Sequence, residues 1–337
     1  MKSRLSRQPR HLTWLVLVIT LALTTVTLVQ SARGKIVFTS SRDRDGDDDI
    51  YVMNSNGTNV QRLTNHPARD WGPVWSPTGQ QIAFVTVRDG NLEIYVMNAD
   101  GTSQRNLTNF PGHDSHPAWS PDGQKIAFTS KRNGVEDIYV MDADGANQKN
   151  LTNHPAESFT CSWSPDGRSI AFASYRDGDS EIYIMDASGK NPRRLTHMPH
   201  GCWHPAWSPD GSQIAFIANE SGPLAVGPED YDIYVIDATG ENLRDLTKHP
   251  AQDLYPSWSP DGRQIVFMSL GRKKANEGNE IYVMTANGTH FRNLTKHPAI
   301  DTYPSWLNVT AFAVSPSGKQ MTTWGKLKRL TTEASER

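Results

Sequence analysis

Cysteine is scarce in this chain of 337 residues, which contains only Cys161 and Cys202. Two cysteines allow at most one disulfide bridge, so the fold does not rest on a disulfide framework of the kind found in small secreted proteins. Both fall in equivalent loops of neighbouring sequence repeats, where a bridge is geometrically conceivable. Two free thiols, packed as small apolar groups, are the alternative that we favour.

An excess of either charge is also lacking. The chain has 34 Lys and Arg against 36 Asp and Glu, a net charge of −2. The basic residues form no stripe, whereas a nucleic-acid-binding face needs concentrated positive charge to neutralise phosphates. We therefore expect no nucleic acid partner. Separately, we expect the protein to be a monomer.

Catalytic signatures are missing as well. The sequence contains no Gly-x-Ser-x-Gly elbow, no phosphate-binding P-loop and no paired-histidine zinc helix. Each of these motifs places a nucleophile, a phosphate cradle or a metal ligand in a defined local structure. Their absence predicts that the protein is not an enzyme.

Long hydrophobic runs are limited to one, Trp14–Val29, near the start of the chain. It follows a cationic stretch and precedes the small residues Ser31 and Ala32, the order found in secretory signal peptides. Residues 1–32 are therefore predicted to be a signal peptide, or alternatively a retained membrane anchor. In both cases the remainder lies outside the cytoplasm, periplasmic or secreted, and only this segment would contact a membrane.

A repeated phrase, Trp-Ser-Pro-Asp-Gly, organises the rest of the sequence. Its Ser-Pro-Asp-Gly part is typical of a type I turn, because Pro presets the second position and Gly suits the fourth. The phrase begins at Trp119, Trp163, Trp207 and Trp258; Trp75 carries a variant with Thr78, and Trp306 only the first residue.

Three further signals follow each phrase in a fixed order: an Ile-Ala-Phe run, an Ile-Tyr-Val-Met run and a Leu-Thr pair. Asn-Gly or Asp-Gly pairs between the last two are strong hairpin signals. Runs that are apolar at every position predict strands covered on both faces, as in small sheets stacked around an axis. The predicted fold is an all-β propeller of four-stranded antiparallel blades over residues 33–306.

The strand count predicts how this propeller closes. Three strands precede the first Trp strand, and Tyr303–Trp306 is a Trp strand with no successors. Joining them gives six blades, with blade 1 built from residues 35–64 and 302–306, and hides the sheet edges of an open array. Residues 307–337 echo the repeat weakly and are predicted to be a decayed repeat or a strap.

These motifs resemble those of the TolB-like, WD-repeat-like propeller family, and the resemblance extends over about residues 35–306. It implies an exported binding or scaffold protein that recognises a protein or a cell-envelope component, such as a glycan or lipoprotein. A propeller serves many functions, so the fold alone does not specify the partner.

The blade loops predict where recognition takes place. One face of the disc carries the Ser-Pro-Asp-Gly turns, which hardly vary between blades. The other, here called the variable face, carries the loops before each Trp strand and those between the second and third strands. Residues three and four before each Trp are expected to ring the channel mouth on the variable face: Trp71, His116, Trp203, His204, Tyr255 and Tyr303.

Two other interpretations of these mouth residues remain open. The aromatic side chains suit a protein segment or a sugar ring, or they merely cap the blade core. Alternatively, His116 and His204 belong, with nearby acids, to an exported polysaccharide lyase or hydrolase.

A second group of candidates comes from departures within the repeat. An Asp five residues before Trp and an Arg four after Phe are expected to pair in blades 1, 2 and 3, and this pattern breaks in blades 4, 5 and 6. Blades 5 and 6 also have longer loops, so Glu220, Asp253 and Arg272 are predicted to contribute to recognition. Tolerated surface insertion is the alternative.

One carboxylate cluster is dense enough to consider a cation. Oxygen-rich Asp-x-Asp-Gly-Asp loops can bind Ca²⁺, and the candidate ligands are Asp43, Asp45, Asp47 and Asp49. The alternative is a lengthened, solvated turn. No other cofactor is expected, and the His-Pro pairs that recur in the repeat are interpreted as architecture rather than as ligands.

Overall fold

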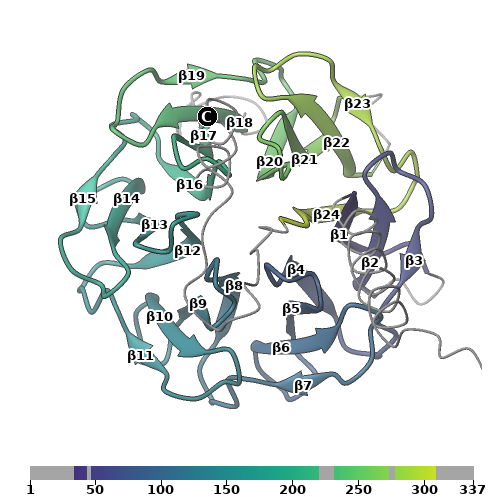
Figure 1. Cartoon of the computed structure of the whole chain (residues 1–337), viewed down its shortest axis with the longest axis horizontal. Helices are drawn as coiled ribbons and strands as arrows, with labels where there is room; N and C mark the ends of the chain where they lie inside the picture. Colours follow the sequence, from purple (N-terminus) through teal and green to yellow (C-terminus); the bar gives the residue numbers. More distant parts are fainter. Residues whose placement is uncertain (1–33, 44–46, 220–230, 273–277, 309–337) are drawn as a thin grey trace, which may run out of the picture.

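The computed structural model describes residues 34–43, 47–219, 231–272 and 278–308. These residues form six four-stranded sheets arranged as blades around a central axis (Figure 1). Each blade is antiparallel throughout, and its innermost strand carries the repeat's Trp. The predicted six-bladed, all-β propeller is therefore confirmed.

The strands of blades 1 to 3 run from the axis outward. They are β24 (Asp301–Trp306), β1 (Lys35–Ser40), β2 (Asp49–Asn54) and β3 (Gln61–Arg62); β4 (Asp70–Trp75), β5 (Gln81–Thr86), β6 (Glu93–Asn98) and β7 (Arg105–Asn106); and β8 (Asp114–Trp119), β9 (Lys125–Ser130), β10 (Asp137–Asp142) and β11 (Lys149–Asn150).

Blades 4 to 6 repeat this order. Their strands are β12 (Ser158–Trp163), β13 (Ser169–Ser174), β14 (Glu181–Asp186) and β15 (Arg193–Arg194); β16 (Cys202–Trp207), β17 (Gln213–Asn219), β18 (Tyr231–Asp237) and β19 (Arg244–Asp245); and β20 (Gln252–Trp258), β21 (Gln264–Leu270), β22 (Glu280–Thr285) and β23 (Arg292–Asn293).

Blade 1 is closed by both ends of the propeller sequence. Strand β24 pairs antiparallel with β1, with Trp306 opposite Ile36 and Asp301 opposite Ser40. Immediately after β24, the Leu307 amide donates a hydrogen bond to the Lys35 carbonyl at 3.1 Å. The predicted closure is therefore confirmed, and the sheet edges that an open array would expose are paired.

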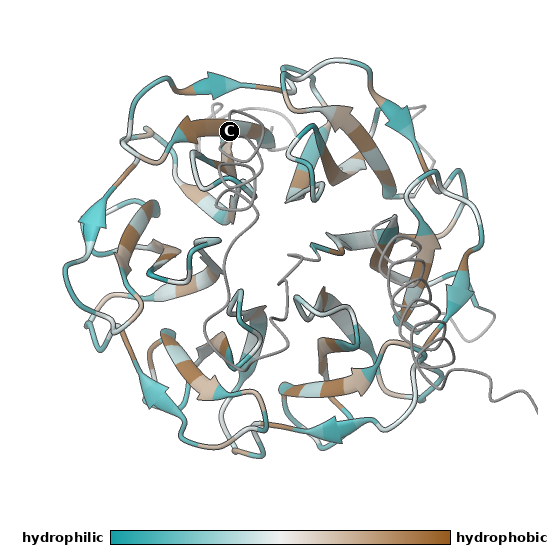
Figure 2. Cartoon of the chain, in the orientation of Figure 1, coloured by the Kyte–Doolittle hydropathy of each residue, from teal (hydrophilic) through white to brown (hydrophobic). Residues whose placement is uncertain are grey.

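The core consists of layers between neighbouring blades. In the layer between blades 1 and 2, the fully buried Val37 and Ile50 pack with Trp75 and Phe84. Figure 2 shows the same gradient around the ring, with apolar second and third strands inside and polar fourth strands outside. This two-sided burial explains why the Ile-Tyr-Val-Met runs are apolar at every position.

A buried acid–threonine pair ties the third strand of each blade to its fourth. In blade 1 the Thr64 hydroxyl donates to the Asp49 carboxylate and accepts from the Ile50 amide, both at 2.9 Å. Burial raises the pKa of Asp49 to about 6, although Thr64 and Arg62 oppose the shift. This function of the recurring Leu-Thr pair was not predicted from the sequence.

The predicted turn and the recurring His-Pro pairs are both architectural. In the turn after Trp119, the Gly123 amide donates to the Ser120 carbonyl at 2.9 Å, with φ of +70° at Gly123. In the His-Pro loops, the histidine Nδ1 accepts a backbone hydrogen bond, as His66 does from Ala68 at 3.0 Å. These histidines thus take part in the structure of their loops.

The two predicted terminal segments lie mostly outside the described residues. These are the targeting segment, residues 1–32, and the tail, of which Leu307 and Asn308 are described. Leu307 is buried and packs in the layer between blades 1 and 2. Among the described residues, no helix has both the length and the apolar character needed to cross a bilayer.

Candidate functional site

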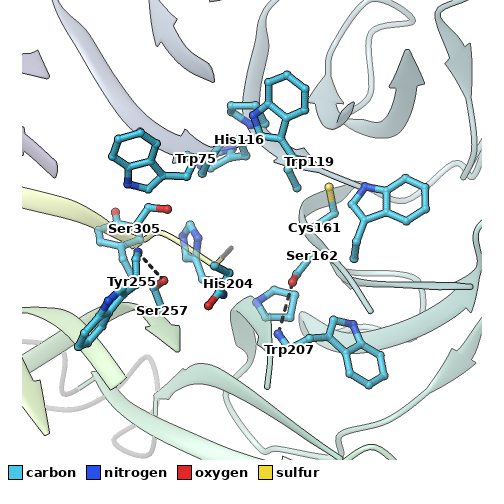
Figure 3. A pocket seen from close by; sticks show the side chains of 18 of the residues that line it. Trp75, His116, Trp119, Cys161, Ser162, His204, Trp207, Tyr255, Ser257 and Ser305 are labelled. Atoms are coloured by element: carbon cyan, nitrogen blue, oxygen red, sulfur yellow. Dashed lines mark hydrogen bonds between the residues drawn. The ribbon is translucent and has the colours of Figure 1, made fainter. Parts of the chain in front are cut away.

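A cavity of about 330 Å³ runs along the propeller axis between the six innermost strands. It is lined by side chains from all six blades, as Figure 3 shows from close by. Strands β4, β8, β12, β16, β20 and β24 therefore position most of the described lining residues, and residues of the Ser-Pro-Asp-Gly turns, such as Pro121 and Pro209, line the cavity toward the opposite face.

A β-bulge in each innermost strand places one residue in this wall. The register of the strand shifts three residues before each Trp, and the bulged residue has a left-handed φ between 43° and 61°. Such a conformation is costly for residues other than glycine and is often kept where a side chain must be re-aimed. The residues are Gly72, His116, Thr160, His204, Tyr255 and Tyr303.

Four of these bulged residues form a chain of contacting rings, here called the ring chain. His116 and His204 have ring centroids 5.5 Å apart, and His204 meets Tyr255 edge-on at 4.6 Å. Tyr255 stacks on Tyr303 at 4.1 Å, and their hydroxyls are hydrogen-bonded at 3.1 Å. The ring chain thus joins blades 3, 5, 6 and 1 through the cavity.

The smaller bulged residues of blades 2 and 4 make this arrangement sterically feasible. Thr160 lies between the two histidine-bearing blades, and its hydroxyl accepts a hydrogen bond from the His204 amide at 3.3 Å. Because a threonine and not a large ring stands in blade 4, His116 and His204 meet across it.

The cavity is electrically neutral. None of its described lining residues is Asp, Glu, Lys or Arg. Burial lowers the pKa of His116 to about 4. Burial, with a smaller effect from His116, also lowers the pKa of His204 well below its usual value. Both imidazoles are therefore uncharged at neutral pH, and burial raises the pKa of Tyr255, which keeps its hydroxyl protonated.

These shifts predict a pH-dependent contribution to stability. Because His116 has a pKa of about 4 when folded and about 6.5 when unfolded, the unfolded chain takes up the proton first as the pH falls. Between pH 7.5 and 5, the wild-type unfolding free energy should fall by about 2 kcal/mol more than that of His116→Gln. Urea unfolding at both pH values measures the difference. Thr160→Val, a non-titrating change in the same wall, is the control, and its unfolding free energy should fall by as much as that of the wild type between these pH values. An equal fall in His116→Gln would contradict the prediction.

The structure places five of the six predicted mouth residues in the cavity wall, namely Trp71, His116, His204, Tyr255 and Tyr303. Trp203 is not among the lining residues. Its ring meets Tyr231 edge-on at 5.8 Å and covers Gly201, where an added Cβ would come within 2.6 Å of the indole. Trp203 thus packs against the core of blade 5. This agrees with the alternative that the aromatic residues cap the blade core.

The second group of candidates needs one correction. The expected ion pairs form in blades 1 to 3, as between Arg88 and Asp70, but the pattern does not break in blade 6. There Arg272, one residue beyond the repeat position, binds Asp253 through Nε at 3.1 Å and through a terminal nitrogen at 2.5 Å. The longer strand β21 shifts the arginine by one residue and preserves the pair. Glu220 lies outside the described residues.

Two of the candidate calcium ligands, Asp43 and Asp49, bind arginine and hydroxyl donors instead. Asp43 forms an ion pair with Arg62 at 2.6 Å and accepts a hydrogen bond from Tyr51, and Asp49 binds Arg62 and Thr64. Among the residues the structure describes, no three His, Cys, Asp or Glu side chains gather as metal ligands. Asp47 takes part in no such group, and Asp45 lies outside the described residues.

A further cavity residue, Cys161, was not selected from the sequence. Both cysteines are free thiols, and Cys161 faces the cavity (Figure 3). Burial raises the pKa of its thiol to about 12, so it is protonated at neutral pH. Its position is Pro in the other five innermost strands, and this departure within the repeat was the available signal.

Comparison with known proteins agrees with this geometry. The family model described as TolB beta propeller domain matches residues 31–109, 102–232 and 202–275. A 41-residue stretch is 44% identical to the Tol-Pal system protein TolB of Nitratidesulfovibrio vulgaris. That match covers 12% of this chain and 9% of the relative, less than a tenth of its length.

Two solved structures share the fold. TolB from Acinetobacter baumannii superposes with a TM-score of 0.71 at 24% identity, covering 82% of this chain and 67% of that one. A putative TolB from Agrobacterium tumefaciens superposes with a TM-score of 0.61 at 23% identity. This match covers 77% of this chain and 87% of that one. The family match extends over most of the propeller, and the chain belongs to the TolB beta propeller domain family.

Proposed function

We propose that this protein acts outside the cytoplasm, in the periplasm or after secretion, as a binding protein. Its partner is a protein segment or another component of the cell envelope, which docks at the cavity mouth on the variable face. Membership of the TolB beta propeller domain family supports this role, as does the signal-like sequence at residues 1–32.

The ring chain is the observation that carries the proposal. Its four side chains combine apolar ring faces with polar edges, and tyrosine, which supplies two of them, is enriched where proteins bind one another. The surrounding wall carries no charge among its described residues. It therefore suits an uncharged group of the partner. The Tyr255 hydroxyl donates to the Tyr303 hydroxyl at 3.1 Å, which leaves the Tyr303 hydroxyl a proton to donate to a ligand.

Capture from the native envelope fraction with the full chain tests the proposal. The Tyr255→Ala variant should weaken binding of the captured partner by about 10-fold or more, because buried aromatic anchors dominate such interfaces. Leu243→Ala is the control, since this exposed leucine lies before the outer strand β19, away from the lining residues. Equal affinity of both variants and the wild type would overturn the proposed site.

An exported lyase or hydrolase acting on a polysaccharide is the second candidate. The contact between His116 and His204 favours it, but the acids expected beside them are not among the described lining residues. Calorimetric titration with Mn²⁺ and Zn²⁺ separates the two functions. Stoichiometric binding that His116→Gln abolishes would favour the enzyme over the binding protein.

A further inference from the structure

An arginine occupies the same place in five of the six blades that the structure describes. In four of these blades its guanidinium lies over the Phe of the second strand and the Tyr of the third; in blade 2, Arg88 lies 5.6 Å from Phe84 and 4.8 Å from Tyr95. In blade 6, Arg272 lies over Phe267 and Phe291 instead. In four blades this guanidinium binds a fully buried aspartate at the start of the innermost strand. The pairs are Arg42–Asp301, Arg88–Asp70, Arg132–Asp114 and Arg272–Asp253.

Blade 4 has the arginine without the aspartate. Arg176 lies 5.0 Å from Phe172 and 4.8 Å from Tyr183, as its counterparts do. The aspartate position holds Ser158, whose hydroxyl is 2.9 Å from the Ser174 hydroxyl. Arg176 donates one hydrogen bond, from Nε to Ser174 at 3.2 Å, and within the described residues it forms no ion pair.

A second arginine partner is also missing from blade 4. In blades 2 and 3, the other terminal nitrogen of the arginine donates to a glutamine at 2.7 Å, Gln104 or Gln148. The equivalent position in blade 4 is Pro192, which has no side-chain acceptor. Within the described residues, both terminal nitrogens of the half-buried Arg176 thus lack the acceptors that Arg88 and Arg132 have, and they remain free to donate hydrogen bonds.

The surroundings leave this cation available on the variable face. Asp177, the adjacent acid, accepts a hydrogen bond from Tyr183, and Asp137 acts on Arg176 only at longer range. Burial lowers the pKa of Arg176, and Tyr183, Asp177 and Asp137 oppose the shift only in part. Beside it, the exposed Tyr175 contacts Phe159 at 5.5 Å between ring centroids.

We propose that Arg176 is an anion-binding subsite that takes a carboxylate, supplied by an Asp or Glu side chain of a partner protein. The sister blades provide the reason, because a carboxylate is the group that their arginines bind at this place. The planar fork of a guanidinium matches two carboxylate oxygens, and the adjacent Tyr175 and Phe159 offer apolar surface to the same segment.

This assignment deepens the proposed function and rests on the variable face being the recognition face. Its test uses a small probe instead of the partner, so failure of the subsite is distinct from failure of the binding role. The full chain, labelled with ¹⁵N-arginine, is titrated with N-acetyl-glutamate amide while the arginine Nε–H signals are recorded. N-acetyl-glutamine amide and inorganic phosphate are the comparison probes.

The Arg176 signal should shift saturably with the glutamate probe, whereas the glutamine probe should leave it unchanged. Arg88 is the internal control, since Asp70 and Gln104 already engage its terminal nitrogens. Equal responses of Arg88 and Arg176 would overturn the subsite. A response to phosphate without one to the carboxylate would overturn the proposed ligand.

Ser158→Asp provides the sharper variant, because it places in blade 4 the carboxylate that four sister blades have. The new carboxylate should form an ion pair with Arg176 and thereby reduce binding of the glutamate probe at least 10-fold. Arg176→Gln removes the reporting signal, so its affinity for the glutamate probe is measured by calorimetry; the variant should not bind the probe, and it decides the matter if Ser158→Asp does not unfold cooperatively. Undiminished affinity in a folded variant of either kind would contradict the proposal.

Discussion

Ending the chain at Ala299 is expected to abolish the cooperative unfolding transition of the propeller. The truncation removes β24, the innermost strand of blade 1, together with the buried Trp306 and Leu307. Losing a buried tryptophan alone costs about 3–5 kcal/mol, and the whole domain is stable by only about 5–15 kcal/mol. The truncation also leaves Arg42 without Asp301 and exposes the edge of β1.

Differential scanning calorimetry of the full and shortened chains measures this effect. Adding a synthetic peptide of residues 300–308 in trans is the matched control, since it returns the missing strand without restoring the covalent link. The peptide should recover a transition at high concentration. A shortened chain that unfolds cooperatively within a few degrees of the full one would show that β24 is dispensable.

Replacing Asp70 by Ala is expected to lower the free energy of unfolding by about 3 kcal/mol. Both carboxylate oxygens of this fully buried residue accept from Arg88, at 2.9 and 2.8 Å. Removing one member of a buried ion pair leaves the other charge uncompensated, which typically costs about 3–5 kcal/mol. The retained bond from Arg88 to Gln104 places the expected cost at the lower end of this range.

Chemical denaturation of three variants tests the origin of this cost. Ser158→Ala, at the equivalent position of blade 4, removes only a hydroxyl and should cost about 1 kcal/mol or less. The double variant Asp70→Ala with Arg88→Met should regain part of the stability lost in Asp70→Ala, because the uncompensated charge is gone. If the double variant is less stable than Asp70→Ala, packing rather than charge dominates the effect.

The sequence was sufficient to predict the architecture because every blade repeats the same local signals. Periodic burial determined the strands, and the count of Trp strands predicted the closure between β24 and β1. The ion pairs of blades 1 to 3 also followed from position alone. In blade 6, however, the longer β21 moved the pairing arginine to Arg272, and a strict positional rule could not allow for that shift.

The candidate site was predicted less completely, because ring orientation depends on contacts between blades and within loops. Trp71 and Trp203 occupy the same repeat position, yet only Trp71 lines the cavity, since Trp203 packs on Gly201 and Tyr231. The contact between His116 and His204 likewise joins blades that are not neighbours. No local pattern encodes either outcome.

The outermost strands of the blades limit edge-to-edge pairing between molecules of this protein. Each consists of two residues, the first of them exposed and polar, as Gln61 and Arg105 are. So short a ladder offers a neighbouring molecule too few backbone groups to extend a blade sideways. The rim of the disc should therefore resist strand pairing between molecules, the kind of contact that leads to fibres. Contacts with other molecules are then expected on the two flat faces.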